Sequence, residues 1–131
     1  MDTSIERLCL GRMQNPVRGF LHGSAALLSL IGAAVLWRAA TDDLGMRVAL
    51  VVFAASLVGL YSVSSLYHSF PWQAQWKRRM QRLDHSMIYV LVAGTYTPFA
   101  LAVLDGPWLV AALVATWGIT IVGVAQKVFW P

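Results

Sequence analysis

Charged side chains are scarce in this sequence. Asp, Glu, Lys and Arg make up 12% of its 131 residues, whereas about 25% is usual for soluble proteins. Hydrophobic residues make up 58% of the chain, and one soluble domain of this length could not bury so much apolar surface. The scarcity of charge therefore excludes an ordinary soluble domain and favours an integral membrane protein.

The few charges are unevenly spaced, so that long stretches contain none. Uncharged stretches follow Arg18, Arg47, Asp84 and Asp105, and each is as long as the ~20 residues that a bilayer-spanning helix needs, or longer. Lipid offers no partner for backbone N–H and C=O groups, so these segments should be helical. The sequence predicts a polar arm at 1–18 and an all-α membrane domain at 19–131. Its four transmembrane helices are expected at about 19–38, 47–69, 85–104 and 107–127.

Cysteine is nearly absent as well. The single Cys9 excludes an intrachain disulfide and any CxxC redox or zinc motif. The arm around it is too polar for the apolar core of a signal peptide, so we expect the first span to remain as an anchor. Ile5, Leu8 and Leu10 predict a short interfacial helix in this arm, ended by Gly11 or Pro16.

Acidic residues are outnumbered, and the net charge is +4. A basic chain can bind nucleic acid, but the distribution of the cations favours a topology signal. With the N-terminus in the cytoplasm, eight of the ten cations fall in inner segments, as the positive-inside rule requires. We therefore expect both termini inside, no nucleic-acid partner, and an inner loop at 70–82 that touches anionic lipid. The eight are Arg7, Arg12, Arg18, Lys77, Arg78, Arg79, Arg82 and Lys127, and the outer two are Arg38 and Arg47.

Two short motifs indicate how the spans pack. The turn "DGP" at 105–107 is so short that the third and fourth spans should be antiparallel neighbours. The small residues of "AGT" at 93–95 would allow a neighbouring helix to approach closely.

Polar residues inside the spans are few and gather at one end. Tyr61, Ser64, Ser65 and His68 follow the spacing i, i+3, i+4, i+7, which places them on one face of a helix. The third span begins with Asp84 and His85 at the inner end, and His22 lies in the first turn of the first span. Burying a polar group at membrane depth costs free energy, so we expect each of these residues to have a structural or functional role. One reason is a metal site, because imidazole and carboxylate are good Zn²⁺ ligands.

Simpler interpretations of the same residues are also compatible with the sequence. His22 and His68 can be interfacial side chains that reach water. Asp84 can cap the N-terminus of the third helix, where an acid complements the dipole. Ser64 and Ser65 can bond back to carbonyls one turn earlier in their own helix.

Three segments together resemble a known family. They are "SSLYHSF" at 64–70, "LDHSMIYVLVAGTYTPF" at 83–99 and "WGITIVGVAQKVFWP" at 117–131. The chain resembles the haemolysin III family, the bacterial relatives of the progestin and adiponectin receptors (the PAQR group). The resemblance implies about seven spans, a cytoplasmic N-terminus and a place in the bacterial inner (plasma) membrane. The wider superfamily, which includes the alkaline ceramidases, implies a zinc-dependent membrane hydrolase that acts on lipids.

The resemblance also implies roles for particular residues. His68 corresponds to a metal ligand, Asp84 to the aspartate that holds a metal-bound water, and Ser64 to the family's serine in the second span. Asp84 and Ser64 are thus the candidate catalytic residues. The family's remaining ligands come from a His-x3-His motif in a late span, and no histidine follows His85 in this sequence.

We therefore expect a chain that resembles the N-terminal part of a seven-helix fold and carries an incomplete zinc site at its cytoplasmic end. His22 and His85 are further candidate ligands, and a second chain in an oligomer is another source. If the protein is active, the expected reaction is hydrolysis of an amide or ester bond in a lipid. The alternative is a non-enzymatic protein that perturbs membranes, as a haemolysin or pore does, or acts like a receptor.

Overall fold

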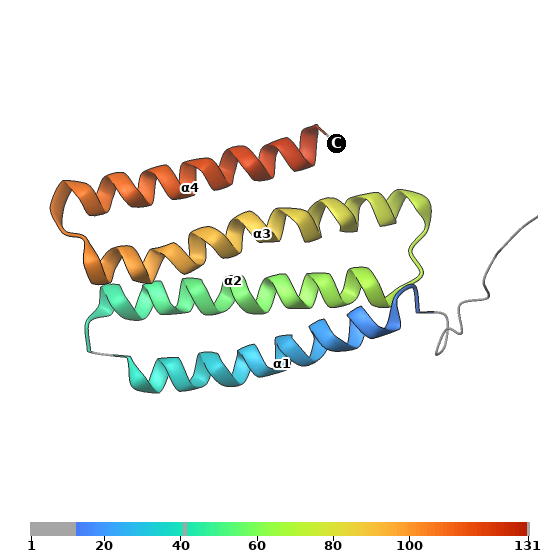
Figure 1. Ribbon diagram of the computed structural model, residues 1–131, viewed down its shortest axis with the longest axis horizontal. Coiled ribbons are helices and arrows are strands. Elements are labelled where there is room, and N and C mark those ends of the chain that lie inside the picture. Colours follow the sequence, from blue (N-terminus) through green and yellow to red (C-terminus); the bar gives the residue numbers. More distant parts are fainter. Residues whose placement is uncertain (1–12, 41, 131) are drawn as a thin grey trace, which may run out of the picture.

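The computed structural model describes residues 13–40 and 42–130, and four long helices account for nearly all of them (Figure 1). They are α1 (Pro16–Ala39), α2 (Leu44–Ser69), α3 (Ala74–Val103) and α4 (Gly106–Phe129). Each is long and apolar enough to cross a membrane. The described residues contain no strand. The prediction of an all-α membrane protein with four transmembrane helices is confirmed.

The residues at the helix ends explain where three of these helices begin. Pro16 opens α1, in the first turn, where its missing N–H has no helical partner to lose. Asp43 caps α2, since its carboxylate accepts a hydrogen bond of 2.9 Å from the backbone N–H of Met46. Gly106 starts α4 with a φ of 53°, a left-handed conformation that suits glycine, and Pro107 follows it. The predicted interfacial helix of the arm falls largely in 1–12, outside the described residues.

The third helix begins earlier than the apolar segment does. We expected the third span at 85 after an inner loop at 70–82, but α3 already begins at Ala74. Residues 74–82 are mostly Ala, Gln, Lys, Arg and Met, which are strong helix formers. Hydropathy finds the part of a helix that suits lipid and misses a polar extension of the same helix. The basic residues Lys77 to Arg82 therefore belong to α3.

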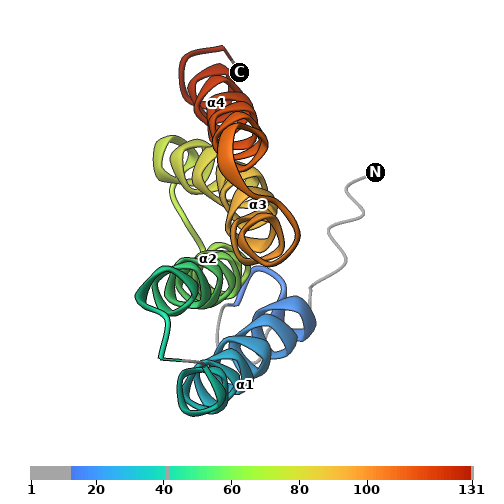
Figure 2. The same cartoon turned by 90° about the vertical axis from the view of Figure 1, so that its left-hand side faces the viewer.

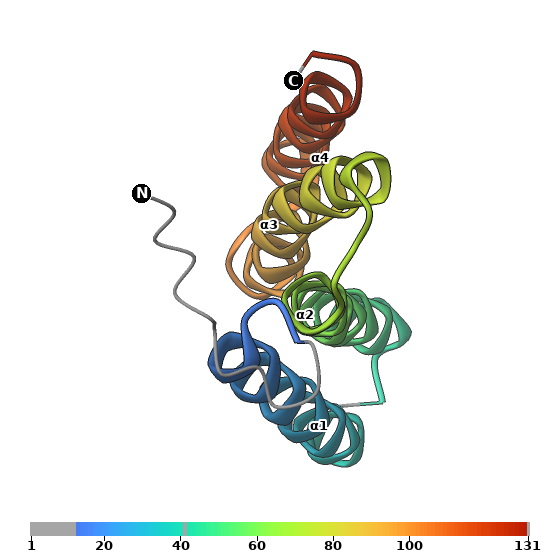
Figure 3. The same ribbon diagram turned by 90° about the vertical axis from the view of Figure 1, so that its right-hand side faces the viewer.

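The four helices form an open row. Each helix packs against the next one in the chain, α1 on α2, α2 on α3 and α3 on α4. End-on views show α1 and α4 at opposite edges of this row (Figures 2 and 3). Neighbouring helices are antiparallel, as the turn at 105–107 predicted for α3 and α4.

The buried residues of this row are small. Among the described residues, no large side chain is fully buried, and the buried apolar ones are alanines. Leu, Ile, Val, Phe and Trp side chains lie mostly on the outside, where lipid tails can solvate them. Small residues on the contact lines let the helix backbones approach each other. The buried set comprises Gly19, Ala49, Ser56, Ser64, Ser86, Ala93, Gly94, Ala100, Thr120 and Gly123.

Gly94 and Gly123 lie at close approaches between neighbouring helices. Gly94 of α3 faces Ser56 of α2, and a Cβ built on Gly94 would lie 2.8 Å from the Ser56 Cβ and 3.4 Å from the Val52 carbonyl oxygen. Gly123 of α4 faces the ring of Tyr89, whose carbons would be 2.5 Å from an added Cβ. The expectation of close packing at "AGT" is confirmed, because Ala93 and Gly94 are both buried.

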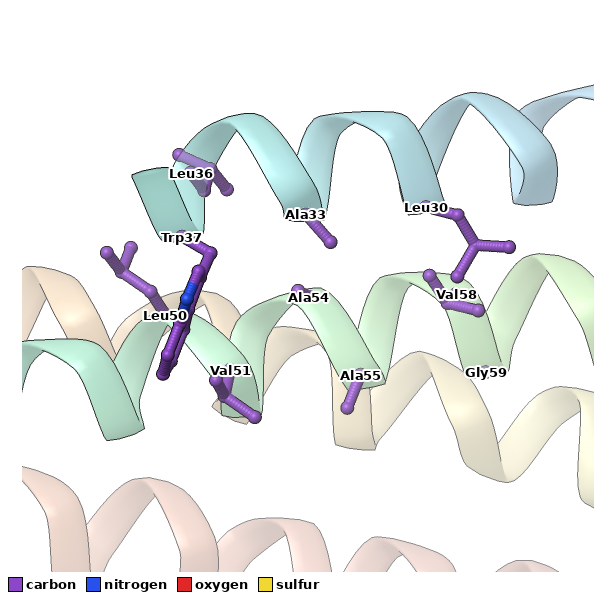
Figure 4. A pocket seen from close by; sticks show the side chains of 10 residues that line it. All are labelled: Leu30, Ala33, Leu36, Trp37, Leu50, Val51, Ala54, Ala55, Val58 and Gly59. Carbon is purple, nitrogen blue, oxygen red and sulfur yellow. The ribbon is translucent and has the colours of Figure 1, made fainter. Parts of the chain in front are cut away.

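An apolar groove of about 490 Å³ opens between α1 and α2 (Figure 4). It is lined by Leu30, Ala33, Leu36, Trp37, Leu50, Val51, Ala54, Ala55, Val58 and Gly59. None of these side chains is ionisable, so the groove suits an acyl chain and offers no group for acid–base or metal chemistry. The side chains suited to acid–base or metal chemistry lie elsewhere in the molecule.

The contact between Gly94 and Ser56 yields a stability prediction. Gly94→Ala places a methyl group against the Ser56 side chain and should lower the free energy of unfolding by about 1–3 kcal/mol, the usual cost of overpacking. The measurement is unfolding of the purified protein in mixed micelles, with helicity followed by circular dichroism.

Gly118→Ala is the matched control. Nothing lies within 4 Å of a Cβ added at Gly118, in the middle of α4, so this variant should be neutral or gain up to about 1 kcal/mol of helix propensity. Equal effects of the two substitutions would contradict the close α2–α3 contact.

Candidate functional site

The polar residues singled out in the sequence lie at one end of the helix row. This end, called the basic end below, holds the beginning of α1, the end of α2, the first half of α3 and the end of α4. His22, His68 and Asp84 all lie there, as do the cations of α3 and Lys127 of α4. The rest of the row is largely apolar.

The α1–α2 interface at the basic end is held by polar contacts. The Nδ1 atom of His22 lies 2.7 Å from the Ser64 hydroxyl, and the tautomer of His22 decides which of the two donates. The Ser65 hydroxyl donates to the Gly19 carbonyl at 2.8 Å. The backbone N–H of Asn15 donates to the His68 carbonyl at 2.8 Å. The polar face predicted for the second span therefore faces α1.

Aromatic rings surround the histidines of this interface. The His22 ring meets the edges of two rings of α2, His68 at a centroid distance of 5.8 Å and Tyr61 at 5.9 Å. Tyr67 packs beside His68 at 4.8 Å. Ser64, which is only 5% exposed, lies within this group. We define the His22 cluster as His22, Tyr61, Ser64 and His68.

These contacts overturn two of the simpler readings. Ser64 and Ser65 do not bond back to their own helix, because their hydroxyls pair with His22 and Gly19 of α1. Asp84 does not cap α3, because that helix begins at Ala74 and Asp84 lies well inside it. For the two serines the neighbouring helix α1 supplies the partners, and for Asp84 the early start of α3 removes the capping position.

The remaining predicted site residues divide between two places. Asp84 is half-buried on α3 and lies within electrostatic range of His68. In the described part of the chain it forms no ion pair with that histidine. His85 is exposed and lines a different cavity together with Lys127 of α4 and Trp130, which follows that helix. The structure thus gathers His22, Ser64 and His68, places Asp84 nearby, and separates His85 from them.

The donors among the described residues do not suffice for zinc. A structural or catalytic zinc ion takes at least three protein ligands that converge on one point. Within 13–40 and 42–130, no group of three His, Cys, Asp or Glu side chains is placed to hold a metal ion. In addition, one ring nitrogen of His22 already pairs with Ser64. The described residues can therefore form part of a metal site, and they do not form a complete one.

Sequence reasoning missed the partners within the His22 cluster. The i, i+3, i+4, i+7 spacing identified the face of α2 but not the helix that covers it. It also left out Tyr67, which touches His68 and is off that stripe. The signal that could have found the pairing is the position along the helices: His22 lies near the start of α1 and Ser64 near the end of α2, and these consecutive helices are antiparallel.

Fold and site together define a multi-pass helical membrane protein with a cluster of polar side chains at the basic end of its helices. Residues 11–131 match the haemolysin-III related family. The chain belongs to this family, as the sequence motifs predicted.

Curated relatives agree with this assignment. The chain is 38% identical over 112 residues to the hemolysin-3 homolog of Bacillus subtilis, an alignment that covers 86% of this chain and 50% of the relative. It is 37% identical over 113 residues to hemolysin-3 of Bacillus cereus, covering 83% and 50%. The chain thus spans about half the length of the curated relatives it matches. No solved structure matches.

The contact between His22 and Ser64 can be measured as a coupling energy. A double-mutant cycle with His22→Ala, Ser64→Ala and the double variant should give about 0.6–1.7 kcal/mol, the range of hydrogen bonds between membrane helices. The measurement is the free energy of unfolding in mixed micelles.

Ser24 provides the control for this cycle. It lies on α1 near His22 and is exposed. A cycle of His22→Ala with Ser24→Ala should therefore show no coupling. Additive effects of His22→Ala and Ser64→Ala would exclude a stabilising bond between these side chains.

Proposed function

We propose that this chain supplies one part of a metal-dependent, lipid-hydrolysing site in a bacterial inner-membrane protein, and that the part is insufficient alone. The observation that carries the proposal is the His22 cluster, with Asp84 nearby on α3, at one end of an otherwise apolar helix row. Imidazole and carboxylate groups are rare at membrane depth, and they usually serve a binding or catalytic function there.

In this proposal His68 is the ligand that α2 offers, and Asp84 faces the same region from α3. Ser64 positions the ring of His22 through the 2.7 Å contact, which also ties α1 to α2. A bound Zn²⁺ would supply Lewis acidity toward a lipid amide or ester carbonyl. The further ligands would come from another polypeptide segment, either more of the same protein or a second copy.

The proposal predicts weak metal binding by the purified chain. Two imidazoles and one carboxylate that do not converge should leave the protein with well under one zinc per chain after dialysis, and hydrolysis of a fluorogenic lipid amide should stay at background. Zinc is measured by mass spectrometry of the metal, and hydrolysis by product fluorescence.

His68→Ala and His85→Ala are the matched pair for this measurement. Residual zinc binding should fall in His68→Ala and stay unchanged in His85→Ala, because His85 lies in a separate cavity. Stoichiometric zinc with robust turnover in the monomeric wild-type chain would refute the incomplete site. Equal zinc binding by the two variants would show that His68 is not a ligand of the site.

A second candidate function is membrane perturbation. Its support is the name of the relatives, hemolysin-3. Pore formation needs a polar path through the membrane, and the polar cluster of this chain occupies one end of the helices. Dye release from liposomes that persists in His68→Ala would favour this function over hydrolysis.

We also propose that the basic end faces the cytoplasm, because eight of the ten cations then lie on the inner side. A cysteine introduced by Gln75→Cys, in a Cys9→Ser background, should resist a membrane-impermeant thiol reagent in whole cells, whereas one from Asp42→Cys should react. The reverse labelling pattern would show that the basic end faces the outside of the cell.

A further inference from the structure

A second polar feature lies at the basic end, between α3 and α4, and shares no residue with the His22 cluster. It is a cavity of about 250 Å³, called the basic cavity below. Its lining consists of Arg78, Gln81, Arg82 and His85 from α3, of Lys127 from α4, and of Trp130, which follows the end of α4. Nothing in the proposed hydrolytic site uses these residues.

On the α3 side the lining follows helical spacing. The four residues of α3 lie at i, i+3, i+4 and i+7, so they share one face, and Lys127 comes from the last turn of α4. Two helices thus bring the permanent cations Arg78, Arg82 and Lys127 to one place.

The charge of the basic cavity is not balanced by acids of the described chain. No Asp or Glu lines it. Asp84 precedes His85 by one residue, which turns it about 100° away around α3. The ion pair found among the described residues, Arg47–Asp42, lies at the opposite end of the row. Three converging cations without a counterion favour the binding of an anion.

The Arg82 guanidinium is already held in place. Its Nη1 atom donates to the Val128 carbonyl of α4 at 3.1 Å. This bond uses one of five N–H donors, and the others belong to the same planar fork. A fixed guanidinium beside a lysine ammonium suits a phosphate, which accepts several hydrogen bonds at once.

The surroundings indicate where such a phosphate would come from. Ile88 and Val92 follow His85 at i+3 and i+7, so they extend the cavity face of α3 toward the membrane interior. They are 54% and 50% exposed. Trp130, 82% exposed, is of the residue type that favours headgroup depth. The cations at the end of the helix row match the phosphate headgroup of a phospholipid, and the exposed apolar side chains toward the membrane interior match its acyl chains.

We propose that the basic cavity binds the headgroup phosphate of one anionic phospholipid. Arg82 and Lys127 contact the phosphate from the two helices, Arg78 adds a third charge, and the acyl chains lie along Ile88 and Val92. The lipid bridges α3 and α4 at the basic end. This site is separate from the proposed hydrolytic site, and its test involves neither zinc nor turnover.

Arg79 provides a matched control on the same helix. It carries the same charge as Arg78 and lies at the same depth, but its guanidinium stacks over the Trp76 ring at 5.1 Å and it does not line the cavity. If a basic helix were simply attracted to an anionic surface, Arg79 would contribute as much as Arg82. If the lipid binds in the basic cavity, Arg82 contributes and Arg79 does not.

The experiment titrates the purified full chain, in neutral detergent, with phosphatidylglycerol or phosphatidylcholine and counts bound lipid by native mass spectrometry. Phosphatidylglycerol should saturate one strong site, and phosphatidylcholine should not. Arg82→Gln and Lys127→Gln should each weaken this site about fivefold, as expected for removing one cation near a phosphate. Arg79→Gln should change the affinity less than about twofold.

The other outcomes are equally decisive. Equal weakening by Arg79→Gln, or equal binding of both lipids, would overturn the proposal. Glycerol 3-phosphate should not displace the lipid at millimolar concentration, and displacement there would assign the cavity to a soluble phosphate instead. If Arg82→Gln fails to fold because it loses the bond to Val128, Lys127→Gln still decides, since the described structure gives the Lys127 side chain no hydrogen bond to lose.

Discussion

A polar group inside a bilayer must find its hydrogen-bond partner within the protein, and this constraint shapes the whole helix row. Several hydroxyls meet it locally: those of Ser86, Thr95 and Thr97 donate to a carbonyl four residues earlier in their own helix. Others, those of Ser64, Ser65 and Thr120, meet it across an interface.

The crossing bonds mark where helices are fixed to each other. Ser64 and Ser65 connect α2 to α1, and the Thr120 hydroxyl of α4 donates to the Tyr89 carbonyl of α3 at 3.2 Å. Between α2 and α3 the contact is steric instead, with Gly94 against Ser56. Since lipid tails are as apolar as leucine, such small and polar residues, rather than large hydrophobic ones, determine how the helices pair.

The sequence predicted the architecture well because lipid leaves few alternatives. Charge-free stretches identified four helices, and the short turn at 105–107 identified one antiparallel pair. The start of α3 was missed, because the polar residues from Ala74 onward form helix without being apolar. For the site, the stripe of Tyr61, Ser64, Ser65 and His68 was correct as a face. Its partner His22 required tertiary structure, as did the separation of His85 from His68.

The length of α3 has a mechanical consequence. Its 30 residues make a rod of about 45 Å, whereas the hydrocarbon core is about 30 Å thick. The rod must therefore tilt or project beyond the lipid tails, and the segment from Ala74 to Arg82 is the part suited to project. Because Asp84 lies on the same helix as the cations, and on the same side of Pro98, a change in bilayer thickness or surface charge that tilts this part of α3 also moves the carboxylate relative to His68.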